Sequence, residues 1–229
     1  MNQRPADERS LLRAAWRPGA VVYLGCCLVS LAAGLGSGFV LPRPQPGPAP
    51  LMVLQTVAVG QVVFFLLIYP VILLSRARRN DKRKIFPESI IECTTLLAIA
   101  APLLIIAAFL SDATAMDVVR IIILEISFLP VSLACGLWLG RPGARTAVWA
   151  SMLLSLLALP VVYYIFYDFV PGVNASWLWD FAPTTLVWKN ASARGSSWLV
   201  SPLWAQFAWL ALAAVGFTCH WLFPPREKH

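Results

Sequence analysis

Charged residues are scarce in this sequence. Asp, Glu, Lys and Arg make up 13% of the 229 residues, about half of the share in a typical soluble domain. In contrast, 59% of the residues are hydrophobic and the mean hydropathy is +0.72. A soluble fold could not hide so much apolar surface, so the composition excludes an ordinary soluble globular protein and predicts an integral membrane protein.

Residues and motifs for several kinds of chemistry are also absent. There is no Cys-x-x-Cys pair and no histidine at metal-ligand spacing, because the two histidines are His220 and the terminal His229. The sequence lacks the Walker, zinc-protease and serine-nucleophile motifs. The five cysteines lie in apolar runs and are interpreted as small buried hydrophobic residues. We therefore expect no catalytic residue, no metal site and no cofactor, and a chain that is not an enzyme in its own right.

Six apolar runs are long enough to be transmembrane helices, each of which needs about 20 apolar residues. The first run is too long for the apolar part of a cleavable signal peptide and is expected to stay as a span. A proline-rich stretch at 42–50 separates the first two runs as an extended turn. The sequence thus predicts an all-α membrane domain over 1–229 with spans at about 20–41, 51–75, 88–110, 117–139, 146–167 and 199–223.

The distribution of Lys and Arg predicts the orientation of these spans. Cytosolic connections carry an excess of Lys and Arg near the span ends. Three cations fall on one side, at Arg43, Lys189 and Arg194, and Arg120 falls in the fourth span. Both termini are therefore expected in the cytosol. Fourteen cations fall on the side of the termini: Arg4, Arg9, Arg13, Arg17, Arg76, Arg78, Arg79, Lys82, Arg83, Lys84, Arg141, Arg145, Arg226 and Lys228.

A strongly basic cytosolic segment precedes the third span. Pro87 follows its six cations, and Glu88 and Glu92 come next at a spacing that places them on one helix face. The segment either docks a cytosolic partner or is a positive anchor followed by an ordinary helix start. The candidate partner contacts are Arg76, Arg78, Arg79, Lys82, Arg83, Lys84, Glu88 and Glu92.

The connection between the fifth and sixth spans, at 168–198, is long and aromatic. Such a segment is not expected to be a freely solvated loop, and short amphipathic pieces in the outer membrane interface are predicted. Anchoring alone and capping of a partner both remain open. The candidate outer-surface residues are Trp177, Trp179, Trp188 and Trp198.

Glu125 is an acidic residue inside an apolar run. It lies eight residues into the fourth expected span, about 12 Å from its end. At that depth a carboxyl is paired, protonated or in contact with water, so Glu125 and Ser132 are expected to face protein. Arg120 is better placed to pair with Asp117 than with Glu125. The role of Glu125 is either functional or that of a structural hydrogen bond.

Small residues recur every four positions in the first span, at Ser30, Gly34 and Gly38. Such a row permits close approach of another helix. The partner helix is either in the same chain or in a second copy.

The layout resembles the permease subunits of type-2 ABC exporters, including the haem-exporter-like permeases of cytochrome c maturation. The shared features are six spans with both ends inside, a charged segment before the third span and a long aromatic outer loop. The resemblance implies a coupling helix that contacts a separate ATPase subunit, and re-entrant outer helices over the export path. The stretch from Pro87 to Glu92 differs from the acidic coupling signature of that family.

We therefore expect a permease subunit in the plasma membrane, a bacterial inner membrane, that works with a cytosolic ATPase and forms a homodimer. Its cargo is expected to be amphipathic or lipid-linked. Two alternatives remain: a structural or accessory subunit of a larger membrane complex, and a small-solute carrier or substrate-capture component. The net charge of +7 indicates topology and attraction to anionic membrane lipid, not a nucleic-acid partner.

Overall fold

The computed structural model describes residues 18–40, 52–77, 82–170, 176–192 and 203–222. These residues are almost all helical, and no strand occurs among them. The elements are α2 (Pro18–Val40), α3 (Met52–Val63), η1 (Phe64–Ile68), α4 (Tyr69–Ala77), α5 (Lys82–Leu110), α6 (Ala115–Leu139), α7 (Pro142–Leu153), η2 (Leu154–Ala158), α8 (Leu159–Phe169), α9 (Ser176–Phe181), α10 (Pro183–Ser192) and α11 (Leu203–Leu222).

Six helices among the described residues are long and apolar enough to cross a membrane, which confirms the all-α class and the six candidate spans and leaves the orientation a prediction. A helix suits these sequences because lipid offers no hydrogen-bond partner to a backbone N–H or C=O group. The spans are α2, the continuous unit α3–η1–α4, α5, α6, the unit α7–η2–α8, and α11. Each coincides with one of the six expected runs.

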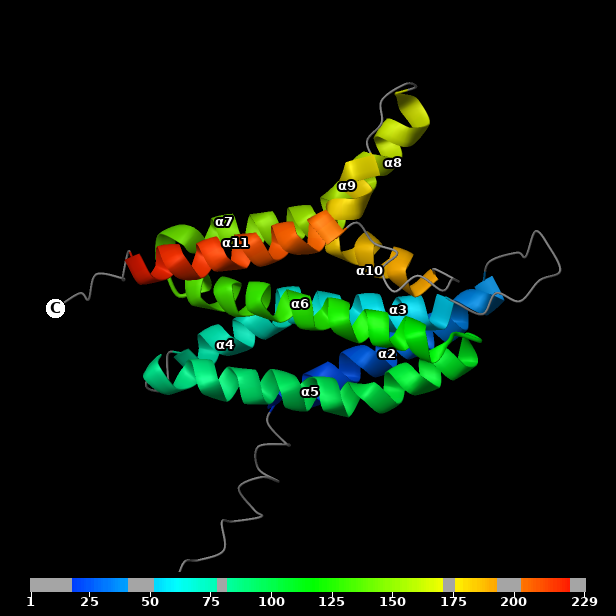
Figure 1. The fold of residues 1–229 in the computed structure, drawn as a ribbon, viewed down its shortest axis with the longest axis horizontal. Helices are drawn as coiled ribbons and strands as arrows, with labels where there is room; N and C mark the ends of the chain where they lie inside the picture. Colours follow the sequence, from blue (N-terminus) through cyan, green and yellow to red (C-terminus); the bar gives the residue numbers. More distant parts are fainter. Residues whose placement is uncertain (1–17, 41–51, 78–81, 171–175, 193–202, 223–229) are drawn as a thin grey trace, which may run out of the picture.

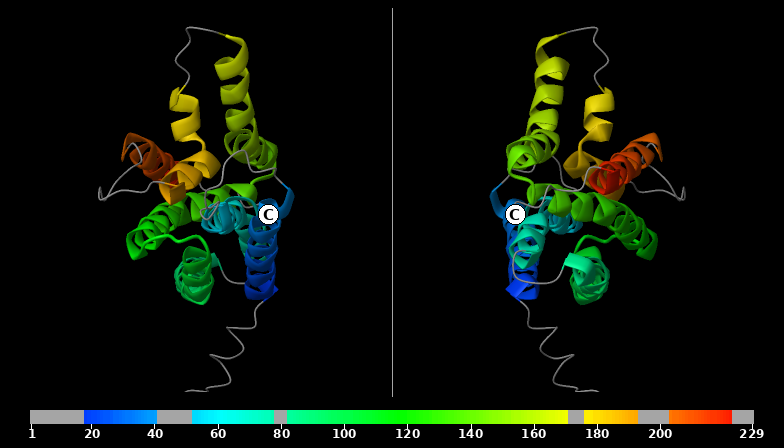
Figure 2. Two further views of the ribbon diagram at one scale, coloured as in Figure 1. Left: turned by 90° about the vertical axis from the view of Figure 1, so that its right-hand side faces the viewer. Right: turned by 90° about the vertical axis from the view of Figure 1, so that its left-hand side faces the viewer.

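The bundle is organised around α3 and α6 (Figure 1). Helices α2 and α5 lie on one side of this pair, and α7 and α11 lie on the other, each against α6 and apart from one another in Figure 2. The short helix α10 lies beside α3 and α6. Helices α8 and α9 turn away from the bundle and project from it (Figure 2).

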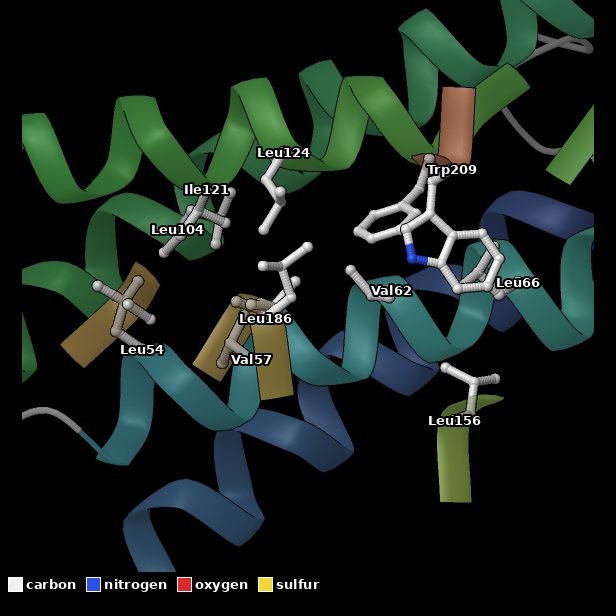
Figure 3. Close-up of a cluster of buried hydrophobic side chains, with 14 of the residues drawn as sticks. Leu54, Val57, Val62, Leu66, Leu104, Ile121, Leu124, Leu156, Leu186 and Trp209 are labelled. Atoms are coloured by element: carbon white, nitrogen blue, oxygen red, sulfur yellow. The ribbon is translucent and has the colours of Figure 1, made fainter. Parts of the chain in front are cut away.

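The main apolar core forms where these elements meet (Figure 3). Leu54 and Val57 of α3 and Ile121 and Leu124 of α6 are almost completely buried there. Leu186 of α10 points into the same cluster, so a helix of the connection between the fifth and sixth spans contributes to the core.

Two helix starts have side-chain caps. Thr114 precedes α6, and its hydroxyl accepts from the N–H of Asp117 while the Asp117 carboxylate accepts from the N–H of Thr114 at 2.9 Å. This reciprocal capping box satisfies N–H groups that a helix leaves unpaired. Near the start of α3, the N–H of Leu54 donates to Ser111 Oγ at 3.0 Å, so the second span is capped from the end of α5.

The second and fifth spans each contain a π-helical turn followed by a proline. At the end of η1, the N–H of Tyr69 donates to the carbonyl of Phe64, and Pro70 follows. At the end of η2, the N–H of Leu159 donates to the carbonyl of Leu154, and Pro160 follows. A proline has no N–H and cannot continue the backbone ladder. The fifth span bends between α7 and α8 (Figure 1). The π turn η2 and Pro160 lie at this bend, and both are known causes of helix kinks.

Candidate functional site

The small-residue row of the first span packs within the chain. A Cβ atom added to Gly34 of α2 would lie 2.9 Å from the Cα of Val53 in α3. A Cβ added to Gly60 of α3 would lie 2.8 Å from the Cβ of Ser30. The glycines therefore let α2 and α3 approach closely. This answers the question left open for Ser30 and Gly34, whereas the surroundings of Gly38 lie outside the described residues.

Helix α6 turns its polar stripe inward, as the sequence predicted. Glu125 and Ser132 are both completely buried. A Cβ added to Gly136 would lie 2.8 Å from a methyl carbon of Leu73 in α4. The stripe faces the second span and not lipid.

The hydroxyl of Ser132 meets a break in the second span. In the π spacing of η1, the next N–H donor to the Phe65 carbonyl would come from residue 70, which is proline. Ser132 donates a hydrogen bond to that carbonyl from α6. Ser132 thus satisfies a buried backbone group of a neighbouring span.

Glu125 lies in a buried polar cluster near the midpoint of α6. The side-chain amide of Gln61, from α3, contacts both carboxyl oxygens of Glu125, one of them at 3.3 Å. The same amide lies 3.8 Å from Cys27 Sγ of α2. Tyr23, one turn earlier on α2, lies within electrostatic range of Glu125 and Cys27. Three spans therefore bring four polar side chains to one point, and Gln61 and Tyr23 are completely buried.

Arg120 belongs to a different network on α6. Its guanidinium donates to Asp117 at 3.0 Å, and both side chains are buried. The predicted pairing of Arg120 with Asp117 is thus present in the structure. In the described part of the chain, no ion pair joins a cation to Glu125.

The connection between the fifth and sixth spans is only partly a surface feature. Trp177 of α9 is 57% exposed, whereas the ring of Trp179 lies 4.9 Å from that of Tyr163 and 5.7 Å from that of Tyr164 in α8. Trp188 is partly buried on α10, and Trp198 lies outside the described residues. We predicted short amphipathic pieces lying in the membrane interface. Helix α10 differs from this prediction, because its apolar face packs against α3 and α6.

A hydrogen bond joins α10 to the bend of the fifth span. The hydroxyl of Thr184 donates to the carbonyl of Leu156 at 3.1 Å. Leu156 lies in η2, where π spacing assigns the backbone donor to Val161, so Thr184 adds a second donor to this carbonyl. Thr184 therefore fastens α10 to the fifth span.

One of the candidate partner contacts that precede the third span, Glu92, lies inside the bundle. Glu92 is 8% exposed and accepts a hydrogen bond from the hydroxyl of Tyr69 at 3.3 Å. A partner contact by Glu92 would require that hydrogen bond to be exchanged. The side chains of the other candidates, Arg76, Arg78, Arg79, Lys82, Arg83, Lys84 and Glu88, lie outside what the structure describes.

A cleft of about 420 Å³ lies between α6, α7, η2, α9 and α11. Trp138 and Trp209 form part of its wall, and Ala213 and Gly216 leave room for it on α11. The spans that contain α7 and α11 are the least buried in the bundle. In each of them 17% of the residues are buried, against 56% in the second span. The cleft therefore lies between the two spans that the rest of the chain covers least.

The polar groups in the cleft wall have partners within the chain. Trp138 Nε1 donates to the carbonyl of Gly216 and Trp209 Nε1 to that of Phe181, both at 2.9 Å. The hydroxyls of Ser151 and Ser155 donate to carbonyls of their own helix, each at 3.0 Å. The wall thus suits an apolar chain or ring, because a polar solute would lose water without gaining hydrogen bonds.

Sequence reasoning missed several of these residues. Gln61 carried a readable signal, since an amide in the middle of an apolar span is costly without a partner. Tyr23 and Cys27 carried none, because both are ordinary residues of buried helices. The cleft residues are mostly apolar and come from three spans and α9, and no spacing along the chain relates them.

No family model matches the chain, and neither a similar curated protein nor a similar solved structure was found.

Proposed function

We propose that this chain is the membrane permease subunit of a multi-component transporter that exports an amphipathic or lipid-linked cargo. A separate cytosolic ATPase supplies the energy, and the complex lies in a bacterial inner membrane. The observation that supports the proposal is the apolar cleft between α6, α7, η2, α9 and α11. It lies on the lipid side of the bundle and holds the apolar part of a cargo.

The polar part of such a cargo stays near the membrane surface while its apolar part occupies the cleft. Exposed side chains of three helical segments border the cleft, with Ser151 on α7, Leu154 on η2 and Leu212 on α11. A cargo can therefore enter from the bilayer without crossing the packed core between α3 and α6. The π turn η2 forms one wall, and π turns are frequent at functional sites.

A bulky side chain at the border of the cleft tests whether it is used. Ser151→Trp fills the opening without removing a hydrogen bond between helices, because its hydroxyl bonds its own helix. Ala150→Trp is the matched control, since Ala150 is exposed on the same helix and does not line the cleft. The probe is a phospholipid with a photoactivatable acyl chain in vesicles of phosphatidylethanolamine and phosphatidylglycerol.

We expect the probe to crosslink to α7 and α11 of the unchanged chain. Ser151→Trp should reduce this crosslinking at least tenfold, and Ala150→Trp should leave it unchanged. Equal crosslinking in all three proteins would remove the cleft as a binding site. Purification from the native membrane tests the transporter assignment separately. A co-purifying ATPase is expected, whereas recovery with a redox or secretion assembly would favour the structural-subunit alternative.

A further inference from the structure

The buried cluster around Glu125 is separate from the cleft and from the proposed cargo path. Its members are Tyr23 and Cys27 of α2, Gln61 of α3 and Glu125 of α6. Cys27, Gln61 and Glu125 lie near the middle of their spans, and Tyr23 lies one turn from Cys27. An ionisable residue at this depth in a membrane protein is a candidate functional group.

Among the described residues around Glu125, no positive charge is placed to keep its carboxyl ionised. Tyr23 and Cys27 face it from α2, and α3 contributes the neutral Gln61. On its own helix, Arg120 is bonded to Asp117. Beyond Tyr23, Cys93 of α5 and Tyr69 of α4 interact with each other. A carboxylate at this point would be a buried charge without a counter-ion, so the packing seen here suits the neutral acid.

Two hydrogen-bond patterns fit the same atomic positions at Gln61. With Glu125 as a neutral acid, its O–H donates to the Gln61 carbonyl oxygen, and Gln61 Nε2 donates to Cys27 Sγ at 3.8 Å. With Glu125 as a carboxylate, the amide turns over and donates through Nε2 to Glu125, while its oxygen faces the Cys27 thiol. A glutamine amide takes the orientation that its network favours, so Gln61 serves both protonation states.

The hydroxyl of Tyr23 is an independent observation that points to a second state. It is completely buried and makes no hydrogen bond to an oxygen or nitrogen among the described residues, where the weakly bonding thiol of Cys27 is the polar group beside it. The great majority of buried polar groups have partners, so an unpaired hydroxyl requires an explanation. It lies within electrostatic range of the Glu125 carboxyl. A movement of α2 toward α6 would let it donate to a carboxylate.

We infer that Glu125, Gln61 and Tyr23 form a proton-binding site in the membrane interior. Glu125 holds the proton in the packing seen here, with its O–H directed at Gln61. When water reaches the site, the proton leaves to that water, Gln61 turns over, and the amide and the Tyr23 hydroxyl donate to the carboxylate. Proton binding thereby controls how tightly α6 packs against α2 and α3.

Infrared difference spectroscopy of the purified chain in lipid nanodiscs tests this inference. A carboxylic-acid carbonyl band that disappears as the pH is raised is expected, and Glu125→Gln removes it. Asp112→Asn is the matched control, because Asp112 is exposed and its backbone φ of 51° is one that asparagine tolerates. That variant keeps the band. Tyr23→Phe keeps the band to higher pH, by about one pH unit, since the carboxylate loses a charge-assisted hydrogen bond.

Two results would overturn the inference. Absence of any Glu125-dependent acid band across the pH range in which the chain stays folded would mean that the carboxyl is always ionised. A band that persists unchanged to the highest such pH would mean a permanently neutral hydrogen-bonding group. Circular dichroism of Glu125→Gln and Glu125→Leu separates folding from titration, because the first retains the hydrogen bond to Gln61 and the second does not.

Discussion

Ser132 and Thr184 occupy equivalent chemical positions in two different spans. Each donates a hydroxyl to a carbonyl near a π turn and a proline, Ser132 to Phe65 and Thr184 to Leu156. An unsatisfied carbonyl in a dry interior costs about 1–3 kcal/mol. Ser132 therefore permits a break in the second span, where Pro70 removes the backbone donor, whereas Thr184 fastens α10 to the bend of the fifth span.

Replacement of Ser132 by Ala is expected to lower the free energy of unfolding by about 0.6–1.7 kcal/mol, the range measured for hydrogen bonds between membrane helices. The loss arises because the Phe65 carbonyl keeps no donor from α6. Unfolding in mixed detergent micelles measures it. Ser127→Ala is the control, since Ser127 donates to Leu124 of its own helix. An equal effect of both substitutions would contradict the assignment.

Replacement of Thr184 by Val removes the hydroxyl that joins α10 to the bend of the fifth span and keeps the side-chain shape. We expect faster amide hydrogen exchange in α10 and α8, with little change in α3 and α6. Mass spectrometry after exchange in detergent provides the measurement. Thr218→Val serves as the reference, because Thr218 is exposed and donates to Ala214 of its own helix. Unchanged exchange in α10 would show that the bond does not hold it.

At the scale of elements, the contact between α2 and α3 depends on the absence of side chains. Gly60 faces Ser30, and Gly34 faces the backbone of Val53. The interface brings Cys27 of α2 within reach of Gln61 and Tyr23 within range of Glu125, so the close approach also builds the polar cluster. Separation of α2 and α3 would therefore weaken both their packing and the polar cluster around Glu125.

Replacement of Gly60 by Ala is expected to destabilise the chain by about 1–3 kcal/mol, because a well-packed interface must shift to admit the methyl group. Thermal unfolding in detergent measures the change. Gly25→Ala should be neutral or stabilising, since an added Cβ there meets nothing within 4 Å. Combination of Gly60→Ala with Ser30→Gly should recover part of the loss. No recovery would show that the methyl group clashes elsewhere.

At the scale of the whole molecule, the arrangement in the membrane is still to be measured. The distribution of Lys and Arg predicts that both termini are cytosolic, with the proline-rich stretch 42–50 outside. Single cysteines at positions 2, 45 and 229 should be read with a membrane-impermeant thiol reagent on intact cells. Labelling at position 45 alone is expected. Labelling at either terminus would reverse or break the predicted topology.

The six spans could be predicted from the sequence because membrane insertion depends on length and hydropathy, which are local properties. The inward direction of Glu125 and Ser132 followed for a related reason, since lipid rejects polar groups wherever the chain folds. The pairing of Asp117 with Arg120 was also local, as both belong to one turn of α6.

Tertiary structure decided which polar groups meet. Glu125 and Gln61 are far apart in the chain, and only the packing of α6 on α3 brings them into contact. The burial of α10 was likewise invisible, because the rows of α3 and α6 that receive Leu186 look like any lipid-facing apolar surface. In lipid, apolar side chains gain nothing by leaving the solvent, so shape and hydrogen bonds between helices select the partners, and neither can be read from one span alone.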